Sequence, residues 1–366
     1  MKQSWEVKEV GDVLSLEYGK PLPKEKRTPN GLYPVYGANG IKDRTNEFYV
    51  EEPSIIVGRK GSAGEINYTE EKFWPLDVTY FTKFDKNELN LDFLFHLLTL
   101  LELPKLAKGV KPGINRNDVY AIKTKIPPLD EQKRIVVKLD ECFEAIDKAR
   151  ANVEKNLNNA KELFQSQLNQ IFSKKGDGWV EMTLGELGKV SMCKRILKKQ
   201  TSPTGDIPFY KIGTFGRTPN AFIDNEIYQE FKQKYSFPNK GDILISASGT
   251  IGRRVVYDGE PAYFQDSNIV WIENNEELIL NEYLYQFYGV CDWNPSKGAT
   301  ISRLYNNDLR RIQISFPSII EQKKLVEIMK DLKAQTQSLK SNYQQELNAL
   351  DELKKSILQK AFNGEL

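Results

Sequence analysis

The strongest constraint on the fold of this chain is that its sequence contains the same pattern twice. Residues 117–172 reappear at 307–362 with a constant offset of 190 (308 − 118 = 190 and 362 − 172 = 190). A constant offset over this length indicates a tandem duplication, and therefore a molecule with two similar halves. The matched residues are Asp118 with Asp308, Pro127 with Pro317, Glu131-Gln132 with Glu321-Gln322, Glu162-Leu163 with Glu352-Leu353, Ser166 with Ser356, Leu168 with Leu358, and Phe172 with Phe362.

The correspondence continues upstream with small shifts. Residues 5–11 resemble 179–185 at an offset of 174, and 55–64 resemble 243–252 at an offset of 188. The offset has reached 190 at Asp118 and Asp308, ahead of the helical pattern, and then stays constant. Insertions therefore fall in the irregular part of each half, and the regular part tolerates none.

Each half ends in a segment with the periodicity of one long helix. In 131–172 apolar residues recur every 3.6 positions with no proline or glycine between them, and 321–362 keeps the pattern. Ser318 and Glu321 have capping-box spacing, and Gly364 is placed to end the second helix. The apolar stripes that we expect to form the helix–helix contact are Ile135, Leu139, Ile146, Val153, Leu157, Phe164 and Leu168, and Leu325, Leu332, Leu339, Tyr343, Leu347, Leu350 and Leu358.

These helices determine the expected architecture. A helix of about 40 residues is about 60 Å long and cannot leave one apolar face in water, so the two stripes should cover each other. The first helix leads to the second globular part, which favours antiparallel packing over a parallel arrangement. We therefore predict an α+β fold with two globular mixed α/β domains, two long antiparallel helices forming a coiled coil, and a pseudo-two-fold repeat. The predicted parts are 1–128, 129–175, 176–317 and 318–366, with strands near 53–57 and 242–245 and core helices near 91–101 and 278–288.

Composition sets the broad class. The net charge of +2 gives no global basic field, so any nucleic-acid surface must be local. Cys142, Cys193 and Cys291 are widely separated and odd in number, which favours free thiols in a reducing compartment. No apolar run approaches the length of a membrane span, and the N-terminal residues lack the apolar core of a signal peptide. We expect a cytoplasmic protein.

Catalytic signatures are weak. The single histidine, His96, lies in an apolar helical segment and is better explained as a core residue than as a ligand or general base. The sequence contains neither a phosphate loop nor an amino-methyltransferase motif. Glu131-Gln132-Lys133 and Glu321-Gln322-Lys323 resemble part of a nuclease motif, but both stand at a helix start, where a carboxylate caps backbone N–H groups. We expect no catalytic residue and no metal site.

Two pairs of basic, glycine-containing segments carry the binding hypothesis. They are 58–64 with 246–254, and 108–116 with 297–303. Glycines let backbone N–H groups approach a phosphate, and arginine or lysine supplies charge, although ordinary exposed turns would look similar. The candidate nucleic-acid contacts are Tyr36, Asn39, Lys42, Arg44, Arg59, Lys60, Ser62, Lys108, Lys111, Asn115 and Arg116 in the first half, and Lys211, Thr214, Arg217, Ser248, Thr250, Arg253, Arg254, Lys297, Thr300, Ser302 and Arg303 in the second.

This combination resembles the specificity subunit of type I restriction-modification systems, over essentially the whole chain. The most specific elements are the segments 126–135 and 316–325, in which a proline precedes Glu-Gln by three residues at the start of a long helix. Phe172 and Phe362 near the helix ends also match. The second copy has Ser318 in place of Pro128 and lacks the Arg-x-Gly form of the first loop, departures that leave the resemblance intact.

The resemblance implies two target-recognition domains, each reading half of a split sequence in double-stranded DNA, with the helices setting the spacer. It also implies that two methyltransferase subunits dock on the helices, that restriction subunits can join, and that this chain performs no chemistry. S-adenosylmethionine, and ATP and Mg for restriction, then belong to the partners. The alternatives are a specificity subunit of a type II enzyme, a coiled-coil scaffold with protein-binding ends, and a self-sufficient nuclease or methyltransferase, for which the sequence offers no site.

Overall fold

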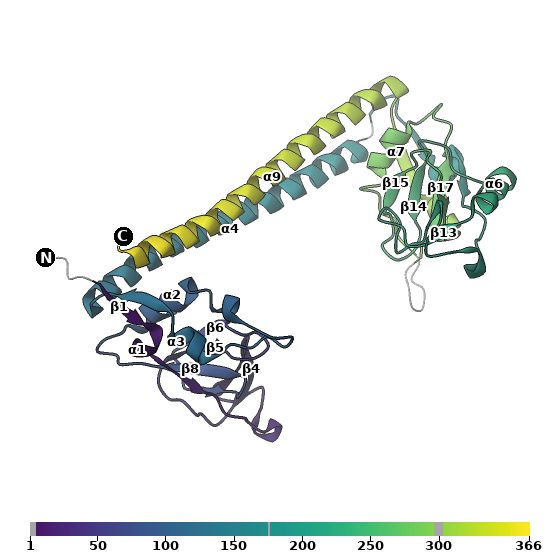
Figure 1. Cartoon of the computed structure of the whole chain (residues 1–366). Helices are drawn as coiled ribbons and strands as arrows, with labels where there is room; N and C mark the ends of the chain where they lie inside the picture. Colours follow the sequence, from purple (N-terminus) through teal and green to yellow (C-terminus); the bar gives the residue numbers. More distant parts are fainter. Residues whose placement is uncertain (1–4, 175, 296–302) are drawn as a thin grey trace. The chain divides into compact units, whose positions relative to one another are not determined.

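The computed structural model describes residues 5–174, 176–295 and 303–366. It divides into two compact units (Figure 1). Unit 1 is Met1–Glu154 with Gln344–Leu366, and unit 2 is Lys155–Tyr343. Each unit therefore contains one globular part together with part of each long helix. The boundary between the units falls inside the helices and not at their ends. The predicted α+β class with an internal repeat is confirmed.

Unit 1 is built on three small sheets. The largest has the strand order β2-β8-β5-β6 and is antiparallel throughout. A second has the order β4-β3-β7, in which β3 and β7 are parallel, and the third pairs β1 with β9. The strands are β1 (Glu6–Glu9), β2 (Ser15–Tyr18), β3 (Tyr33–Gly37), β4 (Gly40–Thr45), β5 (Ser54–Gly58), β6 (Ile66–Thr69), β7 (Trp74–Pro75), β8 (Thr79–Lys83) and β9 (Lys123–Ile126).

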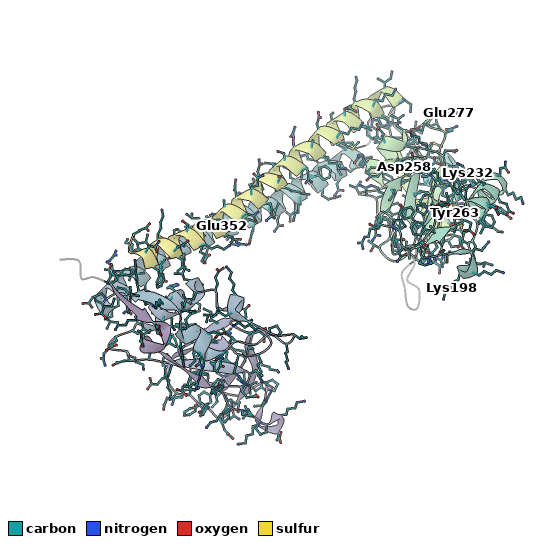
Figure 2. The ribbon with its side chains drawn as sticks, in the orientation of Figure 1. Lys198, Lys232, Asp258, Tyr263, Glu277 and Glu352 are labelled. Atoms are coloured by element: carbon teal, nitrogen blue, oxygen red, sulfur yellow. The ribbon has the colours of Figure 1, made fainter. Side chains whose placement is uncertain are left out.

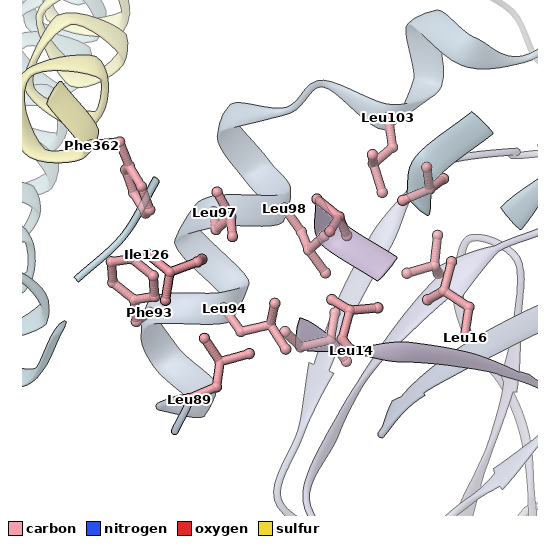
Figure 3. Close-up of a cluster of buried hydrophobic side chains, with 14 of the residues drawn as sticks. Leu14, Leu16, Leu89, Phe93, Leu94, Leu97, Leu98, Leu103, Ile126 and Phe362 are labelled. Atoms are coloured by element: carbon pink, nitrogen blue, oxygen red, sulfur yellow. The ribbon is translucent and has the colours of Figure 1, made fainter. Parts of the chain in front are cut away.

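The main core of unit 1 lies between its helices and the four-stranded sheet. Strand β5 is buried along its whole length, as expected for a central strand of β-branched residues. Phe93, Leu94 and Leu97 of helix α2 are fully buried beside Leu14 and Leu16 (Figure 3). The short helices are α1 (Val10–Val13), α2 (Leu91–Leu100) and α3 (Arg116–Tyr120). The predicted strand near 53–57 and core helix near 91–101 are confirmed.

Unit 2 repeats this plan. Its sheets have the orders β11-β17-β14-β15, β13-β12-β16 and β10-β18, and β12 and β16 are parallel. The strands are β10 (Val180–Thr183), β11 (Lys189–Ser191), β12 (Ile207–Tyr210), β13 (Phe222–Ile223), β14 (Ile243–Ser246), β15 (Arg254–Val256), β16 (Tyr263–Phe264), β17 (Ile269–Glu273) and β18 (Gln313–Phe316). The short helices are α5 (Leu184–Leu187), α6 (Asn225–Lys234), α7 (Asn281–Phe287) and α8 (Asn306–Arg311). The predicted strand near 242–245 and helix near 278–288 are confirmed, the latter with a later start.

Unit 2 has a larger second core than unit 1. Tyr263 and Trp271, both fully buried, lie in an aromatic cluster with Phe209, Phe215 and Tyr228. Helix α6 covers this cluster through Tyr228 and Phe231, and Figure 2 labels Tyr263 within the unit. Part of the insertion that shifts the repeat offset therefore forms an extra helix with its own apolar contacts.

The long helices are α4 (Leu129–Ser173) and α9 (Ile319–Asn363), each within two residues of the predicted bounds. In unit 1 they are antiparallel, because Lys354 contacts Asp147 at 3.0 Å while the earlier Asp351 pairs with the later Arg150. Helix α9 ends where predicted, since Gly364 has a φ of +80°. Ser318 Oγ accepts a 3.4 Å hydrogen bond from the Glu321 N–H, as the capping interpretation expected.

The predicted apolar stripes are buried or half-buried in the helices with one exception. The Leu339 side chain is 42 % exposed, so its assignment to the helix contact is corrected. It borders an open groove in unit 2 together with Leu163 and Tyr343. Small Ala160 lines the same groove opposite, which leaves too little side-chain volume there to cover the leucine.

A buried glutamine fixes the start of each long helix to its own unit. Gln132 is fully buried; its Oε1 accepts from the Asn90 N–H at 2.8 Å, and its Nε2 donates to the carbonyls of Glu88 and Pro127, each at 2.8 Å. In unit 2 Gln322 is bonded in the same way to the Leu280 N–H and to the carbonyls of Leu278 and Pro317, at 2.8–2.9 Å. The repeated glutamine is therefore a structural residue.

Candidate nucleic-acid interface

The two candidate loops of unit 1 lie against each other. The Gly61 N–H donates to the Pro112 carbonyl at 2.9 Å, and the Ile114 N–H donates to the Arg59 carbonyl at 3.0 Å. Gly113 forms bridges with both Lys60 and Lys108. The segments 58–64 and 108–116 thus form one surface, which we call the paired loops of unit 1.

Glycine is required at one turn of this surface. Gly64 has a φ of +85°, and a Cβ there would collide with the backbone of Leu103 and Pro104. Gly61 also has a positive φ, +84°, but no neighbouring atom lies within 4 Å of the place where a Cβ would stand. The first loop is therefore held close to the protein at Gly64 and exposed at Gly61, which leaves its basic residues on the outside.

Two arginines of the paired loops flank an exposed tyrosine. Arg59 Nε donates to the Asp77 carbonyl at 3.0 Å, and its Cζ lies 5.4 Å from the Tyr18 ring centroid. The Arg116 Cζ lies 5.1 Å from the same centroid, and its guanidinium donates to the Leu16 carbonyl at 3.4 Å. Sequence reasoning identified both arginines and missed Tyr18, whose side chain is 47 % exposed.

The remaining predicted residues of the paired loops differ in their availability. Lys60 and Lys111 are exposed. Lys108 pairs with Asp118 at 2.9 Å, an exposed contact that contributes about 1 kcal/mol or less and leaves the cation accessible. Asn115 caps α3 by accepting from the Asn117 N–H at 3.0 Å, and Ser62 is half-buried.

The β3–β4 hairpin supplies fewer contacts than predicted. Tyr36 is buried in the core with its ring 5.8 Å from that of Phe73, so its assignment as a DNA contact is corrected. Arg44 donates to the carbonyls of Gly31 and Leu32 at 2.7 and 2.6 Å, and so braces the hairpin. Asn39 and Lys42 are exposed, as a DNA-contacting role requires.

Unit 2 pairs its loops in the same way. The Leu304 N–H donates to the Ala247 carbonyl at 2.9 Å, and Ser248 forms a bridge with Arg303. Ser248 Oγ also donates to Asn268 Oδ1 at 2.8 Å. Three predicted contact residues lie outside the described residues: Lys297, Thr300 and Ser302.

A basic pocket of about 330 Å³ adjoins these loops in unit 2. Arg303 donates to the Ser267 carbonyl at 2.9 Å, and Arg195 pairs with Asp266 at 2.9 Å. Lys198, labelled in Figure 2, and Lys211 also line the pocket. Four cations facing one carboxylate make it suited to an anion such as a phosphate. Sequence reasoning identified Lys211 and Arg303 but not Arg195 or Lys198.

The other predicted residues of unit 2 divide into exposed and structural ones. Thr250 and Arg217 are exposed, and the Thr214 hydroxyl accepts from the Lys211 N–H at 3.1 Å. Arg253 donates to the Phe215 carbonyl at 3.0 Å. The Arg254 Cζ lies 4.5 Å from the Tyr285 ring centroid and its Nε is buried, so this half-buried side chain packs against the protein, and its assignment as a DNA contact stays a prediction.

The cysteines and the histidine lie away from these loops. Burial raises the pKa of the Cys193 and Cys291 thiols to about 12, so both stay protonated at neutral pH, and all three cysteines are free. Burial lowers the pKa of His96, which packs against Phe143 and lies 3.7 Å from Asp140, as the core interpretation expected. Within the described residues, no group of three potential ligands could hold a metal ion. None of the helices in that part of the chain is long and apolar enough to cross a membrane.

A family model described as the type I restriction modification DNA specificity domain matches residues 2–157 and 176–349. The chain belongs to this family. The resemblance inferred from the two Glu-Gln helix starts is thereby confirmed, and the chain is a DNA specificity subunit with two repeated domains. It is 43% identical over 329 residues to a putative type I restriction enzyme specificity subunit of Haemophilus influenzae, covering 87% of this chain and 85% of the relative.

More distant specificity subunits match along most of their length. The StySPI specificity subunit of Salmonella potsdam is 26% identical over 100% of this chain and 90% of its own. Among solved structures, a chain from a type I restriction-modification system aligns over 100% of both chains with a TM-score of 0.76 and 20% identity. The HsdS subunit of Thermoanaerobacter tengcongensis aligns over 100% of this chain and 98% of its own, with a TM-score of 0.60 and 20% identity. These likenesses show that the fold is shared.

Proposed function

We propose that this specificity subunit reads a bipartite site in double-stranded DNA, each unit contacting one half-site through its paired loops. The observation that carries the proposal is that backbone hydrogen bonds join the two basic, glycine-containing segments in unit 1, and in unit 2 join Ala247 and Ser248 to Leu304 and Arg303 at the described end of the second segment. A pattern that recurs in duplicated units and gathers cations on one surface suits a repeated ligand such as a DNA duplex.

The two kinds of side chain on this surface suggest two kinds of contact. Exposed lysines, such as Lys60 and Lys111 in unit 1 and Lys198 and Lys211 in unit 2, suit the phosphates, which position a protein without reading sequence. Asn39 and Thr250 carry groups that can pair with base edges. The net charge of +2 makes this local concentration of cations necessary for DNA affinity.

The helices offer a surface for the methyltransferase subunits. In unit 2 an open groove of about 530 Å³ is bordered by Leu163, which is 57 % exposed, and Leu339. Exposed leucines around a groove are typical of a helix-docking surface. Leu353 of unit 1, 46 % exposed, holds the corresponding position in the repeat (353 − 163 = 190). Two equivalent surfaces suit two methyltransferase subunits.

With DNA recognition assigned to the two units and methyltransferase docking assigned to the helices, the proposed subunit performs no catalysis of its own. We assign S-adenosylmethionine to the methyltransferase partners, and ATP and Mg to restriction subunits where these join. The helix length would set the number of base pairs between the half-sites, as the spacing of binding modules does in other DNA-binding proteins. We place the working complex in the cytoplasm, where its DNA is found.

A methylome tests the proposed function. The subunit would be co-expressed with the methyltransferase subunit of its own system in a host free of DNA methylation, and the modified bases would be mapped. We expect a split motif with one fixed spacer. A soluble complex that methylates no DNA and shows no salt-dependent DNA affinity would contradict the proposal and favour a protein-binding scaffold.

The same complex separates the type I from the type II alternative. In a type II enzyme of similar architecture, cleavage needs no ATP-dependent subunit. We expect the purified complex of specificity and methyltransferase subunits to methylate its site and to leave unmethylated DNA uncut with Mg present. Cleavage by this complex alone would move the assignment to the type II class.

A further inference from the structure

The exposed tyrosine between the two arginines of unit 1 has no role in the duplicated pattern. We propose that Tyr18 is a base-reading residue of unit 1 and that its hydroxyl forms a hydrogen bond with the edge of a DNA base. Arg59 and Arg116 are its positioning residues. The proposal rests on the proposed function, because it assigns a specific contact to the same surface.

The position of Tyr18 is fixed from several directions. It ends strand β2, where it pairs with Tyr80 of β8, and the two rings meet edge to face with centroids 5.1 Å apart. The Arg59 and Arg116 guanidiniums lie 5.4 and 5.1 Å from its ring centroid and are themselves bonded to backbone carbonyls. A ring held in this way loses little conformational freedom on binding, which favours its use in a specific contact.

The hydroxyl of Tyr18 is the group available for this contact, and it can donate or accept a hydrogen bond. Tyr80 beside it is buried and directs its own hydroxyl to the Ile114 carbonyl at 3.4 Å, whereas Tyr18 is exposed. Base edges offer both donors and acceptors, whereas a phosphate offers only acceptors.

The second unit supports a role specific to unit 1. At the repeat offset of 174 the residue equivalent to Tyr18 is Met192 (192 − 18 = 174). Met192 Sδ accepts a hydrogen bond from the Ser267 hydroxyl at 3.7 Å. The methionine side chain has no hydroxyl group that could contact a base. A structural requirement shared by both units would have been met by similar residues. The difference between Tyr18 and Met192 is therefore consistent with a role for Tyr18 in recognising a base that is present in only one half-site.

The test is the methylome of the complex carrying Tyr18→Phe, which keeps the ring and removes the hydroxyl. We expect the motif to relax at one base pair of one half-site, with discrimination there reduced about tenfold, while the other half-site is unchanged. Tyr18→Met, which copies unit 2, should relax the same position. An unchanged motif with unchanged DNA affinity for both variants would overturn the proposal.

A matched control and a binding assay distinguish the remaining outcomes. Tyr49→Phe removes a hydroxyl from another half-exposed tyrosine of unit 1, which lies beneath Lys20 Nζ at 4.2 Å and outside the paired loops, and should leave the motif intact. If Tyr18→Phe weakens binding equally to the target and to duplexes with one changed base pair, Tyr18 only contacts the backbone and the proposal fails. If the wild-type complex yields no split motif, the proposed function fails first.

Discussion

At the scale of single residues, the most informative position is one whose role the sequence did not reveal. The repeated Glu-Gln pairs suggested helix capping by the glutamate, yet the glutamine is fully buried in each copy and bonded three times. Its partners lie up to 44 residues away in the sequence, so only the folded chain brings them together. The sequence shows that the Glu-Gln pair is repeated, but it does not show that the glutamine is repeated for its buried hydrogen bonds.

Replacing Gln132 with alanine should destabilise unit 1. The change removes the hydrogen-bond partner of the Asn90 N–H and of the carbonyls of Glu88 and Pro127, and the bond to Pro127 is buried. A buried group left without its partner costs about 1–3 kcal/mol, so we expect a loss of about that size in the free energy of unfolding. Urea denaturation measures it. Gln165→Ala, at an exposed position of the same helix, should change stability by about 0.5 kcal/mol or less. Equal effects of the two substitutions would contradict the buried network.

His96 should make unit 1 less stable in mild acid. Burial lowers the pKa of His96 in the folded state, and Lys354 lowers it further. The carboxylates of Asp140 and Asp92 raise the pKa, but by less than burial lowers it. The unfolded chain, with a histidine pKa of about 6.5, then binds the proton more readily, so stability falls as the pH drops below that value. The chain has one histidine, so its imidazole NMR signal can be titrated directly. A midpoint at or above 6.5 would refute this expectation.

At the scale of elements, each long helix serves as a core element in both units. The periodicity predicted both helices within two residues, because a regular stripe over ten turns is the clearest local signal a sequence carries. It did not predict that the end of α9 packs into the core of unit 1. There Leu358, Ala361 and Phe362 join residues from the first globular part, and Figure 3 shows Phe362 beside Phe93. Such contacts join residues that are distant in the sequence, so they produce no periodic pattern of apolar residues.

Phe362→Ala should therefore weaken unit 1. The Phe362 ring lies 4.9 Å from that of Phe93, and a buried phenylalanine costs about 3–5 kcal/mol on truncation. We expect hydrogen exchange to quicken in α2 and to stay unchanged in α7. Phe172→Ala is the matched variant, because its ring lies 5.1 Å from Tyr283 in α7. It should give the reverse pattern. Loss of protection in both helices with either variant would contradict this assignment.

The groove in unit 2 predicts a change in stoichiometry. Leu163→Glu places a charge on an exposed apolar position that we assign to a methyltransferase contact. We expect native mass spectrometry to show one bound methyltransferase subunit instead of two. Leu353→Glu should remove the other, and the double variant both. Gln165→Glu adds the same charge to α4 outside the groove and should leave both subunits bound. Retention of two subunits by Leu163→Glu would exclude the groove as the contact.

At the scale of the whole molecule, the duplication is the feature that the sequence predicts most clearly. The two halves, one buried strand in each and the basic loops were predictable, since each depends on local patterns that occur twice. The joining of the loops was not, because Gly61 and Pro112 are distant in the sequence. Tyr36 was misassigned because a strand aromatic looks the same whether buried or exposed. Tyr18 was missed because its counterpart, Met192, differs, and comparison of the halves emphasises only what they share.

The two units should contribute to DNA affinity as separate surfaces. Lys60 and Lys111 are exposed on unit 1, as Lys198 and Lys211 are on unit 2, and each phosphate contact contributes about 0.9 to the slope of log affinity against log salt. Replacing either pair with alanine should lower the slope by about two, and replacing all four by about four. Fluorescence anisotropy of the complex across a salt series measures these slopes. Glu162→Gln and Glu352→Gln, which alter charge on the helices alone, should leave them unchanged. If one pair accounted for the whole change, the other unit would have no phosphate contact through these lysines, and the assignment of one basic surface to each half-site would be wrong.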